Sequence, residues 1–433
     1  MNLAIIADDL TGANDSGVQL AKYGLQTSVF FKMDAENITE NEAVVFDTDS
    51  RAKKGEEAKE IVEKVTRFLL EHQITNIYKK IDSTMRGSIG HELIGFHNQL
   101  QTDFIFIAAG YPKNGRKVIN GYHYLNERLL SETEIANDPV TPVKESHIPT
   151  LLKEQMGEEV GLINLEVLRS EDVDVFALEL SKLKEQNIKF IVIDSESEED
   201  LQLLLKKAEG LKDSIGWVGS AGLANYLPAF YNLKQKPQKY QIVNIKKPVL
   251  TVVGSVNVNS RNQLTRLLED DVFAIEMKSY KAVSDSNTRT EEISRVYQEV
   301  VSAAKLGKDV VIYSAGEQED IAYAREIGTK NGFDFTATSR EIVTMIGEVA
   351  SRLLKQDLFQ GIVMTGGDTA KKICDKWNVA GFKLYDELEV GVPISSFIGI
   401  DHLFAITKAG GFGKEEVFID AIRKLKGVNV IEQ

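Results

Sequence analysis

Short apolar runs rich in β-branched and aromatic residues alternate along the chain with longer segments of helical periodicity. This alternation constrains the fold more than any other feature of the sequence. Most of the runs are apolar on both faces, which is typical of strands covered by helices on each side. In the first half the pattern predicts strands at 3–7, 27–31, 43–46, 76–81, 104–109 and 189–193, and helices at 55–72, 89–101, 173–186 and 198–211. The rhythm predicts an α/β architecture with a largely parallel sheet.

A change of composition at 234–248 divides the chain. This segment is rich in lysine and carries two prolines, which favours a linker. The rhythm then resumes, with strands predicted at 249–253, 272–277, 309–313, 361–364 and 402–407, and helices at 259–270, 290–306, 319–330, 339–355 and 369–377. A length of 433 residues also favours two domains. We expect domains at 1–235 and 248–433, with the active site in the cleft between them.

The composition excludes several classes of protein. The formal net charge of −14 argues against a broad surface for nucleic acid or anionic membrane. A single cysteine, Cys374, excludes an intrachain disulfide and a cysteine zinc cluster. No apolar run approaches the length of a membrane span, and the N-terminus lacks the pattern of a signal peptide. We therefore expect a cytoplasmic protein without nucleic-acid or membrane partners, and a homo-oligomer stays open.

Two adjacent acids, Asp8 and Asp9, end the first predicted strand. Ligands of open α/β sheets bind beyond the carboxyl ends of strands, where one of these acids could orient or deprotonate a hydroxyl group. The alternative is that Asp8 or Asp9 caps the following helix while Gly12 makes the turn. The motif alone leaves both roles open.

Basic, acidic and hydroxyl side chains converge at two further strand ends. Ser83 or Thr84 can cap the next helix, and Arg86 could grip a carboxylate through two parallel hydrogen bonds. Arg51, which follows a third strand, is a second candidate for the same carboxylate. The set predicts a site for a small hydroxylated acid.

The segment 109–117 nearly matches a phosphate-binding P-loop, because two glycines are separated by four residues. However, Arg116 stands where lysine is required, and Lys117 stands where Ser or Thr should bind magnesium. We interpret the segment as a turn that leads into a hairpin or lid near the substrate.

Three glycine-bearing loops follow strands of the second half, at 254–257, 365–370 and 407–413. Paired glycines let backbone amides approach a ligand closely, and a helix N-terminus favours negative charge. Together the loops predict a polyphosphate cradle. Asp368 could hold magnesium or accept a hydroxyl proton, and its alternative role is a helix N-cap. The segment 389–393 is expected to form a turn that could flank an adenine.

These motifs together resemble those of the four-carbon acid sugar kinases, in the same order and over essentially the whole chain. The resemblance rests on Asp8–Ala13, Lys80–Gly87, Gly254-Ser255, Thr365–Thr369 and Lys408–Gly413. It implies an N-terminal sugar-acid-binding domain and a C-terminal ATP-binding domain. The implied activity is ATP-dependent phosphorylation of threonate, erythronate or 3-oxo-tetronate at the terminal (4-) hydroxyl group, with ATP and Mg²⁺ as cofactors.

The resemblance also implies site residues, although Ala409 replaces a serine that is frequent in the family. That replacement puts in doubt a side-chain hydroxyl but not the amides of Gly410 and Gly411. With their neighbours, the expected substrate-binding residues are Asp8, Asp9, Arg51, Lys80, Asp82, Ser83, Thr84, Met85 and Arg86. The expected ATP-binding residues are Ser255, Thr365, Gly366, Gly367, Asp368, Thr369, Gly410, Gly411 and Gly413.

Phosphoryl transfer relies mainly on positioning and charge neutralisation. Asp368 is the first candidate for the catalytic base and Asp9 the second, while no set of metal ligands is assigned. A non-catalytic sensor that binds a sugar acid and a nucleotide is the alternative. A Rossmann-type dehydrogenase is disfavoured, because no Gly-x-Gly-x-x-Gly follows the strands at 3–7 or 249–253.

Overall fold

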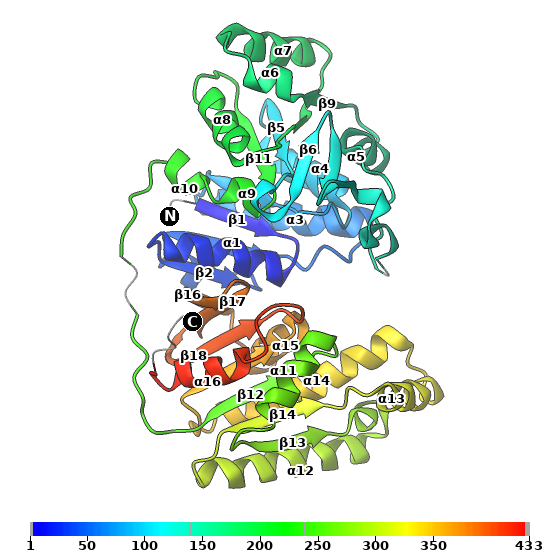
Figure 1. Ribbon diagram of the computed structural model, residues 1–433, viewed down its shortest axis with the longest axis vertical. Helices are drawn as coiled ribbons and strands as arrows, with labels where there is room; N and C mark the ends of the chain where they lie inside the picture. The colour runs from blue at the N-terminus through cyan, green and yellow to red at the C-terminus, as the bar shows by residue number, and fades with distance from the viewer. Residues whose placement is uncertain (1–2, 139, 238–239, 429–433) are drawn as a thin grey trace. The chain divides into compact units, whose positions relative to one another are not determined.

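The computed structural model describes residues 3–138, 140–237 and 240–428. The chain forms two compact units, Met1–Pro237 and Gln238–Gln433, which we call the N-terminal unit and the C-terminal unit. Each unit contains a mostly parallel sheet covered by helices, which confirms the predicted fold class (Figure 1). Within the described residues, no helix has both the length and the hydropathy needed to cross a bilayer.

The sheet of the N-terminal unit is parallel throughout, in the order β2-β3-β1-β4-β11-β5-β10-β9. Its strands are β1 (Leu3–Ala7), β2 (Thr27–Phe30), β3 (Ala43–Asp47), β4 (Ile77–Lys80), β5 (Phe104–Ala108), β9 (Val160–Ile163), β10 (Phe190–Ile193) and β11 (Ile215–Gly219). All predicted strands are confirmed to within a few residues, but β9 and β11 were not predicted. Both contain glycine, which weakens the strand signal of a short apolar run.

The longer helices of the N-terminal unit connect these strands. They are α1 (Leu10–Lys22), α3 (Gly55–Glu71), α4 (Ile89–Leu100), α5 (Ile148–Met156), α7 (Val173–Glu185) and α8 (Glu198–Ala208), with the short helices α2 (Ala35–Ile38), α6 (Leu165–Arg169), α9 (Ala221–Ala224) and α10 (Leu227–Phe230) between them. α8 begins at a capping box in which Ser197 and Asp200 bond each other's backbone amides. Its start therefore follows from the local sequence.

The predicted cap of α4 by Ser83 or Thr84 is wrong, because the helix begins later, with Ser88 as its N-cap. Among the described residues, the Ser88 side chain accepts no capping hydrogen bond. The backbone between strand and helix passes through positive φ at Met85 (58°) and Gly87 (104°), which an α-helix excludes. Residues 83–87 are therefore a loop, and the helix begins only after it, at Ile89.

The segment 109–117 forms a turn and a hairpin, as predicted. A 3-10 helix (Pro112–Asn114) leads into the antiparallel strands β6 (Arg116–Ile119), β7 (Tyr122–Leu125) and β8 (Arg128–Leu129), which form a separate 3-stranded sheet. Gly115 takes a positive φ of 71° and is followed by a strand rather than by the helix that a P-loop requires.

The C-terminal unit has the strand order β13-β14-β12-β15-β18-β17-β16. Its strands are β12 (Val249–Val253), β13 (Phe273–Met277), β14 (Val310–Ser314), β15 (Gly361–Thr365), β16 (Gly381–Glu389), β17 (Val392–Phe397) and β18 (Ile400–Lys408). The first five in this order are parallel, whereas β17 pairs antiparallel with both β18 and β16. The unpredicted β16 and β17 form a hairpin, and the turn predicted at 389–393 connects them.

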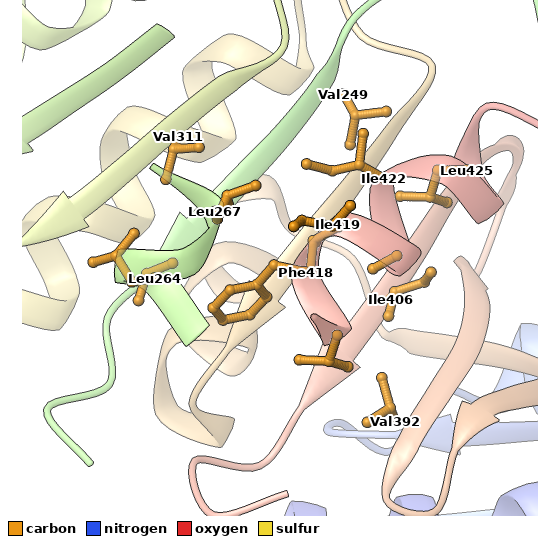
Figure 2. Packing of buried hydrophobic residues seen from close by; sticks show 14 of the residues in the cluster. Val249, Leu264, Leu267, Val311, Val392, Ile406, Phe418, Ile419, Ile422 and Leu425 are labelled. Carbon is orange, nitrogen blue, oxygen red and sulfur yellow. The ribbon is translucent and has the colours of Figure 1, made fainter. Parts of the chain in front are cut away.

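Helices α11 (Val258–Leu267), α12 (Ser286–Lys305), α13 (Gln318–Lys330), α14 (Phe335–Leu354), α15 (Gly367–Trp377) and α16 (Val417–Leu425) cover this sheet. One apolar cluster packs α11 and α16 against the central strands (Figure 2). Its members include Val249, Leu264, Leu267, Ile406, Phe418, Ile422 and Leu425, all buried. The cluster holds together the elements that carry the predicted nucleotide loops. Cys374 is buried in α15.

Candidate functional site

Three of the predicted motifs meet at one edge of the N-terminal sheet. Strand β1 lies between β3 and β4, and the three strands end at the same level, since Ala7 pairs with both Asp47 and Lys80. After β1 the chain forms β2 and β3 on one side of it and then crosses to form β4 on the other, which is the arrangement at which open α/β sheets bind ligands. The side chains that follow these strands are thereby brought together.

Arg51 is the centre of this cluster. Its Nε and Nη2 donate to the two carboxylate oxygens of Asp8, over 2.7 and 3.1 Å, and its Nη1 donates to Asp9 Oδ2 over 2.5 Å. Nη2 also lies 3.6 Å from Asp82 Oδ1. Asp8 therefore binds the Nε–Nη2 edge of the Arg51 guanidinium, the edge that was predicted to bind a substrate carboxylate.

Arg86 makes the same kind of bidentate pair with Asp82. Its Nε and Nη2 donate to the two Asp82 oxygens over 2.7 and 3.1 Å, while its Nη1 lies 3.5 Å from Asp138 Oδ2. Thr84 Oγ1 donates to Asp82 Oδ2 over 2.5 Å. Burial alone would raise the pKa of Asp82, but hydrogen bonding by Arg86 and the charges of Arg51 and Arg86 hold it well below its usual range. Asp82 is therefore ionised.

The adjacent carboxylates Asp8 and Asp9 are shifted in opposite directions. Burial favours the neutral form of both. For Asp8, the charges of Arg51, Lys79 and Lys80 outweigh burial and lower the pKa. For Asp9, burial and the neighbouring charge of Asp8 outweigh the two cations and raise the pKa. Asp9 is therefore the more basic of the two.

Asp9 also fills the structural role considered as its alternative. Its Oδ1 accepts a hydrogen bond from Gly12 N over 2.8 Å and makes Asp9 the N-cap of α1. The turn predicted at Gly12 is wrong, because Gly12 lies inside α1; an added Cβ there would lie 2.9 Å from Lys80 Nζ. The absence of a side chain lets the buried Lys80 ammonium reach the start of α1.

The remaining predicted substrate residues lie in the loop after β4. Thr84 and Met85 are buried and Ser83 is half-buried. Behind this loop, the fully buried Lys79 forms an ion pair with Glu92 of α4, at 2.8 Å between Nζ and Oε2. Sequence reasoning missed this pair. The signal for it was a lysine inside a strand whose other residues are buried on both faces.

His123 is a second residue that the sequence analysis did not select. It lies in β7, fully buried, and neither ring nitrogen has a hydrogen-bond partner in the part of the chain that the structure describes. Burial lowers its pKa to about 4, against the raising effect of the Asp82 charge. A neutral imidazole therefore lies within electrostatic range of the charged cluster. Its sequence spacing gave no signal of this, because the hairpin brings it there.

The three glycine loops of the C-terminal unit likewise meet at one sheet edge. Strands β12, β15 and β18 are parallel neighbours, and their last residues are in register, since Thr365 pairs with both Val253 and Lys408. Gly254-Ser255, Gly366-Gly367 and Ala409–Gly413 follow these residues directly. The loops therefore leave the sheet side by side.

Close contacts between these loops require glycine. A Cβ at Gly254 would lie 2.3 Å from Thr369 Oγ1, and one at Gly410 would lie 2.9 Å from Ser255 Oγ. Gly366 has a positive φ of 95° and donates its amide to Lys408 O over 3.0 Å. The structure thus gathers the predicted nucleotide residues around one point, with Gly411 and Gly413 further along the last loop.

Asp368 lies in the first turn of α15, with its side chain exposed. The N-cap of this helix is Gly366, so the alternative role of Asp368 as a cap is wrong. Its carboxylate is instead placed beside the glycine loops, at a helix end that favours anions. Over the described ranges, no group of three or more His, Cys, Asp or Glu side chains is arranged to hold a metal ion.

Comparison with known families matches both units. A family model described as a sugar-binding N-terminal domain matches residues 3–227, and one described as a nucleotide-binding C-terminal domain matches residues 250–418. The chain belongs to the four-carbon acid sugar kinase family. As a member of this family it is a phosphotransferase that acts on a sugar-acid hydroxyl group, which favours the enzyme over the sensor considered as the alternative.

Individual relatives span nearly the whole chain. A D-threonate kinase of Salmonella typhimurium is 29% identical over 426 residues, which are 98% of each protein. A D-erythronate kinase of Heliobacterium modesticaldum is 29% identical over 410 residues, which are 92% of this chain and 89% of the relative. The crystal structure of a Haemophilus influenzae protein aligns with a TM-score of 0.78 at 25% identity, over 98% of this chain and 100% of that one.

Proposed function

We propose that this family member uses ATP to phosphorylate the terminal hydroxyl group of a four-carbon sugar acid such as D-threonate, D-erythronate or 3-oxo-tetronate. The N-terminal unit would bind the acid and the C-terminal unit would bind ATP. One observation carries the proposal. Each unit has a single cluster of predicted site residues at the carboxyl edge of its parallel sheet, and the two clusters differ in chemistry.

The charged cluster suits a small hydroxylated acid. Asp8 and Asp82 hold the two guanidinium groups in place through bidentate pairs. Arg86 has the more exposed side chain and the looser outer contact, 3.5 Å from Nη1 to Asp138, so we assign it the first contact with the acid carboxylate. Asp9, the more basic carboxylate, would accept a hydrogen bond from a substrate hydroxyl group.

The glycine loops suit the phosphates of ATP. The backbone is open at Gly411, where an added Cβ would meet nothing within 4 Å, and α15 directs its N-terminus toward the same loops. Asp368 would share a Mg²⁺ ion with the phosphates, since Mg²⁺ bound to nucleotides needs only one or two protein carboxylates. When bound, the ion would neutralise charge on the phosphates.

The proton of the substrate hydroxyl group needs an acceptor, and two candidates remain. Asp368 is the first, because its exposed carboxylate lies beside the loops that would hold the phosphates. Asp9 is the second, because its pKa is raised. Against Asp9, both of its oxygens are already engaged, one by Gly12 and one by Arg51. Positioning of the acid hydroxyl against the terminal phosphate supplies most of the remaining catalysis.

A coupled assay of ADP release tests the proposal. The panel holds D-threonate, D-erythronate and 3-oxo-tetronate, with the uncharged tetritol threitol as the matched control that lacks the carboxylate. We expect turnover with at least one acid and none with threitol, and phosphorus NMR should place the phosphate on the terminal carbon. Turnover of threitol at the rate of the acids would contradict the role of the charged cluster. Binding of the acid and ATP without ADP release would instead support the non-catalytic sensor.

A further inference from the structure

The loop Ala409–Lys414 turns its carbonyl oxygens inward, and the buried Lys408 side chain is the first reason. Lys408 Nζ donates to the carbonyl oxygens of Ala409, Gly410 and Phe412 over 3.1, 3.0 and 3.0 Å. Ser260 Oγ donates to the Gly410 carbonyl over 2.8 Å. The ammonium group is thus surrounded by the loop that follows it.

Two amide side chains of α11 hold the rest of the loop. Asn259 and Gln263 are four residues apart, so they lie on the same face of the helix. Asn259 Nδ2 lies 3.2, 3.3 and 3.2 Å from the carbonyl oxygens of Gly411, Phe412 and Gly413. Gln263 Nε2 lies 3.1, 2.9 and 2.9 Å from those of Phe412, Gly413 and Lys414. Every carbonyl of the loop therefore faces one of these three side chains.

The direction of the carbonyls determines the direction of the amides. In a trans peptide the C=O and the following N–H point to opposite sides. The N–H groups of Gly410, Gly411 and Gly413 therefore point away from Lys408, Asn259 and Gln263. In the described part of the chain these three N–H groups donate to no protein atom, whereas Phe412 N donates to Ala409 O and Lys414 N to Glu389 Oε2.

Burying these polar side chains behind the loop costs folding free energy. Lys408 is 2% exposed and Gln263 is fully buried. In the described part of the chain, the groups that contact the Lys408 ammonium are neutral: the loop carbonyls, the Ser260 hydroxyl and the Phe418 ring, whose centroid lies 5.7 Å away. Burial of a cation among neutral groups destabilises a fold relative to an apolar side chain of the same size. Such a residue needs a reason other than packing.

We propose that Lys408, Asn259 and Gln263 are positioning residues, which fix the loop Ala409–Lys414 so that its free amides face the phosphates of the nucleotide. The inference rests on the proposed ATP site and adds to it how the loop acquires its shape. The amides of the glycines would bind the phosphates, and the three polar side chains behind them keep these amides turned outward.

The test compares two glutamines of the C-terminal unit. Gln360 is also buried and also donates its Nε2 to a carbonyl, that of Leu425 at 2.9 Å, but it precedes β15 at the opposite edge of the sheet. We expect Gln263→Leu to weaken ADP binding by about 10-fold, the loss of roughly one hydrogen bond to a charged group. The KM of the acid should not change. Gln360→Leu should lower the melting temperature and leave ADP affinity within about twofold.

A second variant and a second probe keep the test decisive. Asn259 is half-exposed, so Asn259→Ala should fold even if Gln263→Leu does not, and it should weaken ADP binding in the same direction. Inorganic tripolyphosphate, measured by calorimetry, reports on the phosphate cradle without the nucleoside. Equal losses for ADP and tripolyphosphate support the inference. Losses confined to ADP, or none in either variant, overturn it. Failure of the wild type to bind ATP would instead overturn the proposed function.

Discussion

The two candidate sites of this protein are built on the same edge of similar sheets but from different materials. In the N-terminal unit, charged side chains converge, and each cation is already held by a carboxylate, as Arg51 is by Asp8 and Arg86 by Asp82. In the C-terminal unit, backbone amides face outward, and neutral carbonyls behind them are held by Lys408, Asn259 and Gln263.

This difference determines how each site should respond to change. In the charged cluster, cations and carboxylates compensate each other, so the loss of one side chain leaves the charge of its buried partner uncompensated. The amide loops depend on shape, so they should fail when a side chain intrudes or when the hydrogen bonds behind them are lost. Substitutions can therefore distinguish the two sites, because those in one should alter the KM of the acid and those in the other the KM of ATP.

The largest effect is expected at Asp368. If Asp368 is the base, Asp368→Asn should lower kcat by about 10²–10⁴, the usual span for general-base loss, while ligand affinity and fold persist. If it mainly holds Mg²⁺, excess metal should recover part of the rate. kcat, Mg²⁺ dependence and melting temperature of the one variant distinguish these roles. Near-normal turnover at every metal concentration would move the role of base to Asp9.

The charged cluster should respond in the KM of the acid alone. Arg86→Ala removes a charge-assisted contact with the substrate, roughly 2–4 kcal/mol when desolvated, and leaves Asp82 without its bidentate partner. Arg86→Lys keeps the charge but not the paired geometry, so its KM should lie between those of Arg86→Ala and wild type. Arg51→Ala should act in the same direction.

Steady-state kinetics with each substrate varied in turn checks this. A rise in the KM of ATP with the KM of the acid unchanged would reverse the roles that we assign to the two units.

The amide loops should respond to added volume. Gly410→Val places side-chain atoms against Ser255 Oγ and Asn257 Cβ, which already lie 2.9 and 3.1 Å from the position of a Cβ. The loop must move, and we expect the affinity for ATP to fall by about 10-fold or more, on the order of one lost phosphate contact. Calorimetry with ATP measures it, and the affinity for the acid serves as the internal control. An unchanged ATP affinity would remove this loop from the cradle.

The smallest expected effect is a pH dependence carried by Lys408. Burial lowers its pKa to about 8, so its charge is present at pH 7 and largely lost at pH 9. ADP affinity should therefore decline by a few-fold as pH rises through about 8, on the order of one weakened hydrogen-bonded charge. Lys408→Met should show a flat profile over the same range.

Global unfolding would not mimic this decline. Between pH 8 and the ordinary lysine pKa, the unfolded chain binds more protons at this site than the folded chain does. The contribution of Lys408 to stability therefore rises with pH while its contribution to ADP binding falls. Melting temperatures recorded beside the affinities separate the two trends. A parallel decline in wild type and Lys408→Met would sink the assignment.

Much of the fold could be predicted from local sequence patterns. The period of apolar residues predicted most strands and helices, because periodicity depends on which faces a segment buries. The failures are equally local in cause. Strands β9 and β11 contain glycine, and the hairpin β16–β17 lies in a segment whose polar residues hide its alternation. The start of α4 was predicted correctly at residue 89, but its cap was assigned to Ser83 or Thr84 instead of Ser88, because positive φ at Met85 cannot be inferred from the residue type.

By itself, the sequence determined the α/β class, the position of each motif at a strand end and the family, since all three are properties of local order along the chain. Only the tertiary structure decided that Asp8 binds the paired edge of Arg51, and that Asn259, Gln263 and Lys408 hold one loop from behind. The reason is physical. Asp8 and Arg51 are separated by 43 residues, and Asn259 and Gln263 lie about 150 residues from the loop, so strand order and not sequence proximity brings them into contact; Lys408 alone is a neighbour of the loop in sequence.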